Sequence, residues 1–416
     1  MDSSPDEATP AEKRQYPYDP FAADPFPSYD EARERCPVHY QPGFGDGFYS
    51  LFRYDDVVDV FKNLERWSAD EGQGPLRVVE GGLRSDPPEH TIYRRLVTGA
   101  FTAKRTAALE PFIRASAREL VAAMSPAGRG DLIAQVAAPL PVTVISHILG
   151  IPAEERDEFR RLSDQFMESQ LTSDLGVLNA SKEAIYAVFR KEISDRRRDV
   201  SQAGGASRPI PDDMLSSLVV AEHDGKRFTV EELLPLLLLL LVGGIETTTS
   251  LIASLVRRLL EAGLWERALA DDAELLVAIE ESLRFDPPVL GLFRTTRAPL
   301  ELHGVGLPGD AKVMGVFAAA NRDPSVWTDA DTFSLDRSRE ELRRHLSFGA
   351  GIWLCPGAAL ARLEAQVALQ SIAELLPGLR LDGEPRQESR FLTWGPQYLP
   401  LAWDSSQWRQ EQSPPQ

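Results

Sequence analysis

The chain has 416 residues, 43% of them hydrophobic, and a formal net charge of −18. This acidic balance argues against nucleic acid and anionic membrane surfaces as main partners. Two cysteines, Cys36 and Cys355, do not indicate a disulfide framework and fit a reducing compartment. Met1–Pro20 has no apolar signal segment, and the longest apolar run, Leu233–Ile245, is too short to span a bilayer. We therefore expect a soluble, cytoplasmic protein.

The domain organisation follows from composition. Residues 1–20 and 405–416 are polar and rich in Pro, Ser and Gln, so we expect both to be disordered. No linker divides residues 21–404, which predicts one large domain. Its first half begins with short elements, namely a helix at Ser28–Arg35, paired strands at His39–Gln41 and Phe48–Leu51, and a helix at Tyr54–Lys62.

The loop Ser68–Pro88 contains four glycines and three prolines. A loop of this length often forms a lid or a binding loop, although a plain surface connection fits the sequence equally well. Helical patterns begin at Glu89 and continue over Ala103–Met124, Leu132–Leu149, Ala153–Gln170, Leu175–Val200, Pro211–Glu222 and Val230–Ala262. The last of these is long enough to cross the whole domain.

The remaining elements alternate between helices and short strands. The Ala273–Phe285 helix ends before a proline pair, as helices commonly do. A helix at Pro356–Leu376 is preceded and followed by strands at Val289–Arg297, Glu301–Leu302, Lys312–Gly315, Leu379–Leu381, Arg390–Thr393 and Leu399–Ala402. The fold class is therefore predicted to be mainly α with small β-sheets.

The stretch His345–Arg362 carries the strongest chemical signal. A Gly-rich turn precedes Cys355, and Pro356 is a residue favoured at the first position of a helix. A thiol at a helix N-terminus tends toward thiolate, the form that binds metal or attacks carbon. The small residues on both sides allow a flat group to lie close to the backbone. The plainer alternative is a structural cysteine on a glycine-rich turn.

A second signal lies in the middle of the long helix, where the sequence reads Gly243-Gly244-Ile245-Glu246-Thr247. Two glycines cost a helix about 2 kcal/mol relative to alanine, and unpaired polar residues in an apolar helix cost more. We interpret the segment as a notch, widened where a Thr hydroxyl bonds to a backbone carbonyl. A kinked core helix with a satisfied polar pair is the alternative.

Two further pairs have helical spacing. His90 and Arg94 lie on one helix face, where they suit a carboxylate or phosphate. Glu281 and Arg284 are three residues apart, a pair that contributes only tenths of a kcal/mol when exposed. Taken alone, each pair is more commonly a surface feature.

Together these stretches resemble the cytochrome P-450 family. Residues 348–357 resemble its Phe-Gly-x-Gly-x-(His/Arg)-x-Cys-x-Gly loop, 86–94 its Asp-Pro-Pro-x-His-x-x-x-Arg segment, 243–247 its (Ala/Gly)-Gly-x-(Asp/Glu)-Thr motif, and 281–284 its Glu-x-x-Arg motif. The resemblance covers about residues 20–404 with the motifs in family order. It implies a single cytochrome P-450-type domain, with the long helix over haem b, and haem-thiolate monooxygenase activity.

The resemblance also implies residue roles. Cys355 is the axial iron ligand, and Glu246 and Thr247 organise the water that delivers protons. Glu281, Arg284 and Arg337 form a structural ion network. Residues implied to contact the haem are His90, Arg94, Gly243, Gly244, Arg294, His345, Phe348, Gly349, Trp353 and Gly357. The substrate, expected to be small or medium and largely apolar, would contact Leu240, Val289, Leu290, Leu292, Phe293 and Trp394.

Two residues depart from the family pattern. Trp353 stands where the family has His or Arg donating to a propionate, and it offers one N–H but no charge. Pro356 has no N–H to donate toward the cysteine sulfur. Fewer hydrogen bonds leave more negative charge on sulfur, which lowers the potential of such sites.

The partners implied are dioxygen, an organic substrate, and a ferredoxin or flavodoxin with its NAD(P)H-dependent reductase, because the chain carries no flavin or iron–sulfur module. An arginine cluster, Arg337, Arg339, Arg343 and Arg344, fits either a solvated face or a docking patch for an acidic carrier. Three other functions remain possible from the sequence: a peroxide-driven peroxygenase, a haem-binding sensor or carrier, and a haem-free thiol enzyme using Cys355 with His345.

Overall fold

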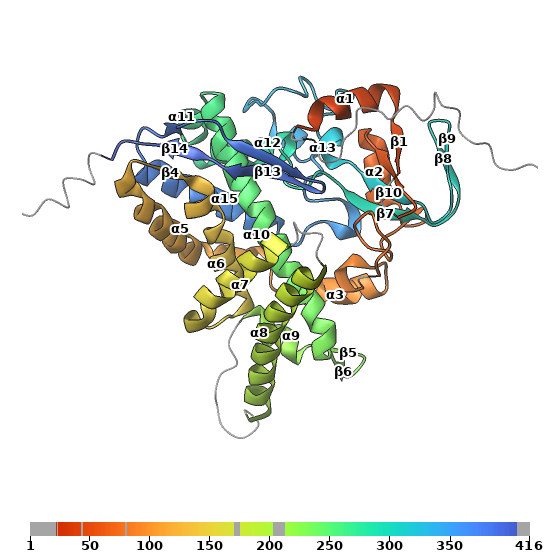
Figure 1. Cartoon of the computed structure of the whole chain (residues 1–416), viewed down its shortest axis with the longest axis horizontal. Helices are drawn as coiled ribbons and strands as arrows, with labels where there is room; N and C mark the ends of the chain where they lie inside the picture. Colours follow the sequence, from red (N-terminus) through yellow and green to blue (C-terminus); the bar gives the residue numbers. More distant parts are fainter. Residues whose placement is uncertain are drawn as a thin grey trace, which may run out of the picture.

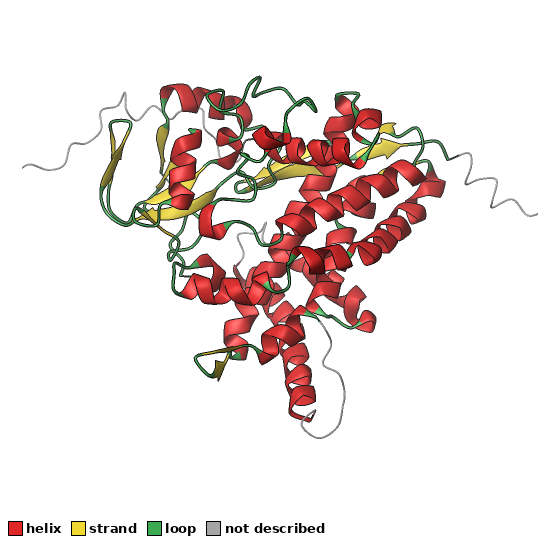
Figure 2. Cartoon of the chain, turned by 180° about the vertical axis from the view of Figure 1, so that it is seen from behind, coloured by secondary structure: helices red, strands yellow, loops and turns green. Residues whose placement is uncertain are grey.

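The computed structural model describes residues 22, 24–42, 45–79, 81–169, 175–202 and 213–405. The two terminal segments expected to be disordered, apart from residue 405, and most of the 201–211 loop lie outside these ranges. Helices gather on one side of the molecule and strands mainly on the other (Figures 1 and 2). The prediction of a mainly α fold with small β-sheets is confirmed.

The largest sheet among the described residues has five strands and joins the N-terminal segment to the middle of the chain. In spatial order the strands are β1 Val38–Gln41, β2 Phe48–Leu51, β10 Lys312–Gly315, β7 Leu292–Thr296 and β3 Trp67–Ser68. β1 and β2 are paired, as the sequence predicts, and run antiparallel with Tyr40 opposite Tyr49, whereas β10 runs parallel to β2. The helices α1 Phe26–Arg35 and α2 Tyr54–Lys62 pack beside this sheet.

The helical half is built around α10, which crosses the molecule diagonally (Figure 1). The other helices are α3 Glu89–Thr98, α4 Ala103–Ala108, α5 Glu110–Met124, α6 Pro139–Leu149, α7 Arg156–Ser169, α8 Leu175–Gln202, α9 Met214–Val220, α11 Trp265–Ala268, α12 Asp272–Phe285, α13 Phe317–Ala320, α14 Arg339–Leu342 and α15 Ala358–Leu375. Helix α10 contacts α6, α8, α12 and α15, so it forms the centre of the largest core cluster.

Smaller strand pairs and short turns complete the described chain. The strands are β4 Arg129–Asp131, β5 Glu222–His223, β6 Lys226–Arg227, β8 Leu300–Leu302, β9 Val305–Leu307, β11 Arg380–Leu381, β12 Arg386–Arg390, β13 Thr393–Tyr398 and β14 Pro400–Ala402. Four 3-10 turns lie at Gly82–Arg84, Ser125–Ala127, Ala153–Glu155 and Gly351–Trp353, and a π turn at Ile133–Ala137.

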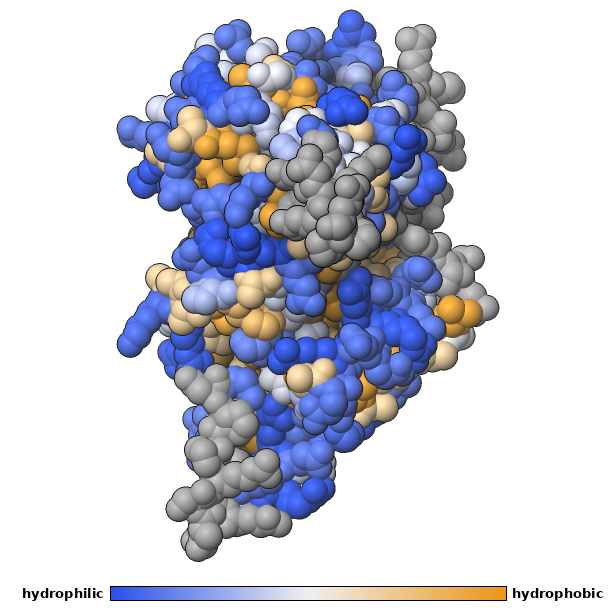
Figure 3. Space-filling view, turned by 90° about the vertical axis from the view of Figure 1, so that its left-hand side faces the viewer, coloured by the Kyte–Doolittle hydropathy of each residue, from blue (hydrophilic) through white to orange (hydrophobic). Residues whose placement is uncertain are grey.

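Helix α10 spans Val230–Glu261, close to the predicted Val230–Ala262. A capping box fixes its start, because the Thr229 hydroxyl accepts from the backbone N–H of Glu232 and the Glu232 carboxylate accepts from that of Thr229. By length and composition α10 is the one described helix able to cross a bilayer, but more than half of its most apolar window is buried within the protein. This burial is typical of a core helix. The face shown in Figure 3 is mainly hydrophilic, with small apolar patches.

Three predicted elements differ in the structure. The expected 103–124 helix is broken at Leu109, because Pro111 lacks an N–H and its ring would clash within a continuous helix. The segment from Leu132 starts as a π turn before α6, whose first turn contains Pro139 and Pro141. The strand predicted at Arg390–Thr393 is interrupted by a hairpin turn: β12 ends at Arg390, β13 begins at Thr393, and Phe391 between them has a φ of +63°.

Candidate active site

Cys355 lies in a turn held by backbone hydrogen bonds. Its N–H donates to the Phe348 carbonyl at 2.8 Å, and the N–H of Gly349 donates to Leu346 at 2.8 Å. Gly349 and Gly351 both have positive φ, and a Cβ on Gly351 would collide with the carbonyl of Phe61 at the end of α2. The glycines therefore allow the turn to close against α2.

The helix after the cysteine begins at Ala358, two residues later than predicted, with Gly357 as its N-cap. Pro356 is thus not in the first helical turn. The backbone N–H groups of Gly357 and Ala358 nevertheless act on the Cys355 sulfur. Burial raises the pKa of the Cys355 thiol, and these two amides with the more distant Arg94 and Arg362 only partly offset it. The helix N-terminus alone therefore does not make this cysteine a thiolate, which corrects the prediction.

The two motif residues of α3 face the cysteine turn. Arg94 donates from Nη1 to the Leu354 carbonyl at 2.6 Å, so it ties α3 to the turn. His90 is buried, and its Nε2 has no hydrogen-bond partner among the described residues. Burial, with nearby Arg94 and Arg294, lowers the pKa of His90. An anion placed beside this ring would reverse that shift.

Arg294 on β7 is fully buried. Its Nη1 donates to the Phe293 carbonyl at 2.6 Å, and its Nε has no partner among the described residues. Burial lowers the pKa of Arg294 to about 9, with only Asp86 opposing. A buried guanidinium with an unpartnered donor is costly without an anion, so the pocket is suited to a carboxylate.

Two residues predicted to contact the haem have other partners. The indole N–H of Trp353 donates to the Ser85 carbonyl at 3.2 Å, not to an open pocket. His345 is buried, with Nε2 3.0 Å from Glu280 and Nδ1 accepting from the N–H of Ser347. The sequence suggested donors in both places, but neither side chain presents a free ring nitrogen to a cofactor. His345 is also placed for an ion pair with Glu280, not for thiol chemistry with Cys355.

The α10 notch has the predicted hydrogen bond. Thr247 Oγ1 donates to the Gly243 carbonyl at 2.7 Å. Glu246 Oε1 accepts from Thr393 Oγ1 at 2.9 Å, and Thr393 lies at the tip of the β12–β13 hairpin. A Cβ on Gly243 would meet open space, whereas one on Gly244 would lie 3.7 Å from Ile145 of α6. Gly243 therefore borders open space, and a Cβ on Gly244 would make ordinary contact with α6.

The predicted substrate residues divide into two groups. Leu290, Phe293 and Trp394 are buried in a core cluster with Phe26 and other residues, so they support the site from behind. Side chains alternate along β7, which places Leu292 on the same face as Arg294 and opposite Phe293. Leu292 and Val289 are partly buried, and Val289 bridges to Thr393 beside Glu246. Leu240 lies one turn before Gly244 on α10.

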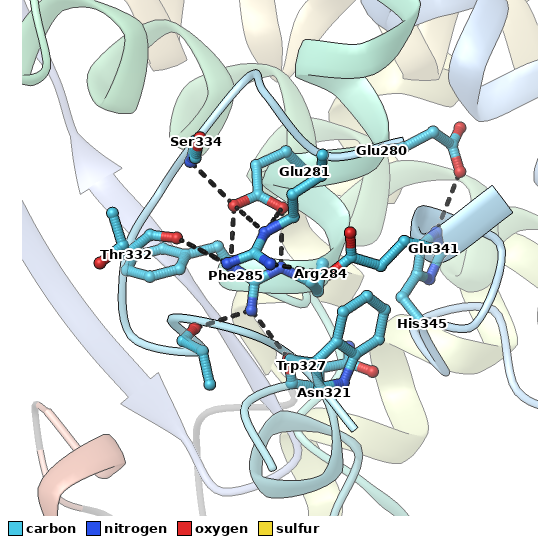
Figure 4. A network of polar contacts seen from close by, with 12 residues as sticks. Glu280, Glu281, Arg284, Phe285, Asn321, Trp327, Thr332, Ser334, Glu341 and His345 are labelled. Carbon is cyan, nitrogen blue, oxygen red and sulfur yellow. Dashed lines mark hydrogen bonds and ion pairs between the residues drawn. The ribbon is translucent and has the colours of Figure 1, made fainter. Parts of the chain in front are cut away.

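The Glu-x-x-Arg motif is a fully buried network (Figure 4). Arg284 makes two 2.7 Å bonds to Glu281, and its remaining N–H groups donate to the carbonyls of Asn321, Ala330 and Thr332. Arg337 adds a 3.2 Å contact to Glu281. All donors of the Arg284 guanidinium are used, so its role is to fix the 321–337 segment beneath the cysteine turn.

The sequence analysis missed a second ion pair at this end. Burial alone would raise the pKa of Glu280, but hydrogen bonds from Arg362 and His345 lower it to about 2. Arg362 also stacks on Phe348, 4.5 Å from the ring centroid. The sequence did contain a signal for this ion pair. Arg362 follows Cys355 by two helical turns, and Glu280 directly precedes the motif residue Glu281. The arginine cluster is divided: Arg337 is buried in the network, while Arg339, Arg343 and Arg344 are exposed.

The residues present fit a haem. The half-buried Cys355 thiol receives two amide N–H groups, Gly357 has no Cβ beside its Sγ, and two buried nitrogen atoms, His90 Nε2 and Arg294 Nε, have no partner among the described residues. These donors suit the two carboxylates of iron protoporphyrin IX. Among the described residues, no group of three or more His, Cys, Asp or Glu side chains could hold a metal by themselves.

Comparisons with known proteins agree with this geometry. Residues 275–375 match the family model described as Cytochrome P450. The chain is 37% identical over 411 residues to mycinamicin IV hydroxylase/epoxidase of Micromonospora griseorubida, covering 95% of this chain and 100% of that protein. It is 36% identical over 403 residues to the cytochrome P450 monooxygenase PikC of Streptomyces venezuelae, covering 92% of both.

Solved structures show the same likeness. A structure of CYP109E1 from Bacillus megaterium in complex with testosterone superimposes with a TM-score of 0.80 at 30% identity, covering 92% of this chain and 99% of that one. The LnmA cytochrome P450 hydroxylase of Streptomyces atroolivaceus gives 0.79 at 32% identity over 91% and 96%. The chain therefore belongs to the cytochrome P450 family and is a haem-thiolate monooxygenase.

Proposed function

We propose that residues 21–404 fold as one haem-binding domain, in which Cys355 is the iron ligand and His90, Arg94 and Arg294 hold the propionates. When bound, the haem supplies the iron that activates dioxygen. The observation that carries the assignment is that the turn bearing the Cys355 thiol also contacts two residues with unpartnered buried nitrogen atoms, His90 at Nε2 and Arg294 at Nε. Trp353 and His345 are left out of the contact set because both already have protein partners.

Proton delivery is assigned to Glu246 and Thr247. The Thr247 hydroxyl uses its proton on the Gly243 carbonyl, so its oxygen remains free to accept from water. The open space at Gly243, one turn away, gives that water a place to lie. Glu246 holds a proton-accepting carboxylate one residue earlier, oriented by Thr393. The pair can thus pass protons from solvent toward the site where oxygen is reduced.

The substrate is proposed to be a medium-sized, largely apolar organic molecule. It would lie against Gly243 and Leu240 of α10, Leu292 of β7, and Val289 beside the hairpin tip. The loop 68–88 would cover it, because its ends are joined where Asp86 accepts from Ser68 Oγ at 2.7 Å and Ala69 N at 2.8 Å. A relative named mycinamicin IV hydroxylase/epoxidase and a related structure in complex with testosterone support a substrate of this kind.

Electrons are proposed to come from a ferredoxin or flavodoxin with an NAD(P)H-dependent reductase in the cytoplasm. The exposed Arg339, Arg343 and Arg344 precede the cysteine turn and would attract an acidic carrier. This part of the proposal predicts a turnover rate that falls with ionic strength.

The decisive test is the absorbance spectrum of the reduced protein under carbon monoxide. A strongly red-shifted Soret band that disappears in Cys355→Ser supports the haem-thiolate assignment, and a colourless protein that cannot be reconstituted contradicts it. Turnover with peroxide but none with a reductase and dioxygen would favour the peroxygenase alternative over the Glu246–Thr247 relay.

A further inference from the structure

Trp353 occupies the centre of the proposed propionate pocket without offering it a hydrogen bond. Its indole N–H is used by the Ser85 carbonyl at 3.2 Å. Its ring centroid lies 4.2 Å from the guanidinium carbon of Arg294 and 6.0 Å from the ring centroid of His90, at an interplanar angle of 63°. One side chain therefore contacts two of the three proposed propionate-binding residues and the loop that leads to α3.

Arg294 lies close to two aromatic rings. Its guanidinium carbon is also 4.7 Å from the ring centroid of Phe61. The arginine is fully buried, so the attraction between cation and ring is not weakened by water. The two rings leave the guanidinium plane little freedom to rotate, and Nη1 is fixed on Phe293. Nε is a buried donor without a partner among the described residues.

The turn that carries Trp353 shows that this placement is specific. Its neighbours Ile352 and Leu354 are 36% and 46% exposed, although both are large apolar residues. Trp353 alone of the three turns inward. The turn closes onto α2 where Gly351 approaches the Phe61 carbonyl, and the rings of Trp353 and Phe61 both lie near the Arg294 guanidinium.

We propose that Trp353 is a positioning residue. It orients Arg294 by stacking and fixes the Ser85–His90 segment through its N–H. Arg294 and His90 would then reach the haem propionates, while the cysteine turn makes no direct contact with them. The inference rests on the proposed function, in which Arg294 and His90 hold that group. The aromatic ring of Trp353 takes the place of the charged donor in the family pattern. Retention of haem therefore depends on how firmly the Arg294 side chain is held in one orientation.

The test is a double-mutant cycle on haem-bound protein, read as the rate of haem transfer to excess apomyoglobin. Trp353→Met removes the ring, and we expect release to accelerate about tenfold. Trp353→Phe keeps a ring but removes the N–H, and we expect an acceleration of about threefold or less. In an Arg294→Gln background, Trp353→Met should add less than about twofold, because the residue it orients is gone.

Three outcomes would overturn the inference. The first is that Trp353→Phe and Trp353→Met accelerate haem release equally. The second is that Trp353→Met accelerates release as much in the Arg294→Gln background as in the wild type. The third is that Trp353→Phe releases haem as fast as Arg294→Gln does. The third comparison decides the matter even if Trp353→Met does not fold. A wild-type protein without the red-shifted carbon monoxide band would instead contradict the proposed function itself, so the two failures are distinguishable.

Discussion

The two sides of the site are built differently. Beneath the cysteine turn, Glu281, Arg284 and Arg337 are buried with every guanidinium donor of Arg284 satisfied (Figure 4). The other side is formed by α10, where Gly243 borders open space, by the tip of the β12–β13 hairpin and by the long loop at residues 68–88. A network of this kind fixes the segment beside the Cys355 turn. The open side is made of segments that relatives can vary, which suits a family with many substrates.

The largest effect is expected from breaking the network. Arg284→Leu leaves the buried Glu281 carboxylate without its partner, which we expect to cost about 4 kcal/mol of unfolding free energy and to abolish haem incorporation. Urea unfolding and the yield of haem-bound protein measure this. The matched control is Arg161→Leu, which removes an exposed arginine three residues after Glu158 in α7. Similar losses in both variants would contradict the comparison.

The cysteine side also contains an unsatisfied carboxylate, that of Glu364 in α15. Burial raises the pKa of Glu364 to about 8, and its Oε2 has no partner among the described residues. The folded state binds its proton more tightly than the unfolded state, so stability is greatest below the unfolded pKa and falls as pH rises toward 8. Glu364→Gln should therefore stabilise the protein by roughly 3 kcal/mol at pH 7 and by little at pH 4.5.

Urea unfolding of wild type and Glu364→Gln at pH 5 and pH 8 measures this difference. The control is Glu374→Gln in the same helix, where the carboxylate is exposed and paired with Arg118. The interpretation fails if the gain from Glu364→Gln is the same at both pH values, or if Glu374→Gln gives the same pattern.

On the open side, the prediction compares two threonines of α10, one with a proposed role in proton delivery and one with a structural hydrogen bond. Thr247 faces Gly243, whereas Thr249 Oγ1 donates to the Ala137 carbonyl at 3.1 Å on another face. We expect Thr247→Ala to reduce the fraction of reductant recovered as product by about tenfold, because the proton relay loses its hydroxyl. Thr249→Ala should leave that fraction unchanged. Product formed per NAD(P)H oxidised, with hydrogen peroxide in solution as the complement, distinguishes the two.

The smallest predicted effect concerns Pro356. The sulfur receives N–H groups from Gly357 and Ala358 but none from residue 356. Pro356→Ala supplies a further N–H, and one hydrogen bond of ~1 kcal/mol corresponds to a rise of about 40 mV in the reduction potential. Spectroelectrochemical titration measures it. A potential that is unchanged or lower would show that the new N–H does not reach the sulfur.

Much of the fold was predictable because helical periodicity and proline positions mark the long elements. Tyr54–Lys62 and Lys312–Gly315 agree residue for residue with the structure. The hairpin at 386–398 was not recognised, because Phe391 and Leu392 have strand propensity and no Gly or Asn marks the turn.

The candidate site was predictable where residues follow each other closely in sequence. The motif spacing located Cys355, His90 and Glu246. Contacts between distant segments, such as Trp353 with Ser85 and Glu246 with Thr393, carry no local pattern. Trp353 shows the difference: the sequence predicted a donor, which is correct chemically, but only the fold shows which acceptor it reaches.

The bond between Glu246 and Thr393 joins residues 147 positions apart, and this has a consequence for synthesis. A ribosome adding about 5–20 residues per second produces the α10 notch roughly 7–30 seconds before the hairpin that completes its wall. During that interval the nascent chain has the helix but not Thr393, and Cys355 also arrives late. Haem capture must therefore be among the last events of biogenesis, after nearly the whole polypeptide has left the ribosome.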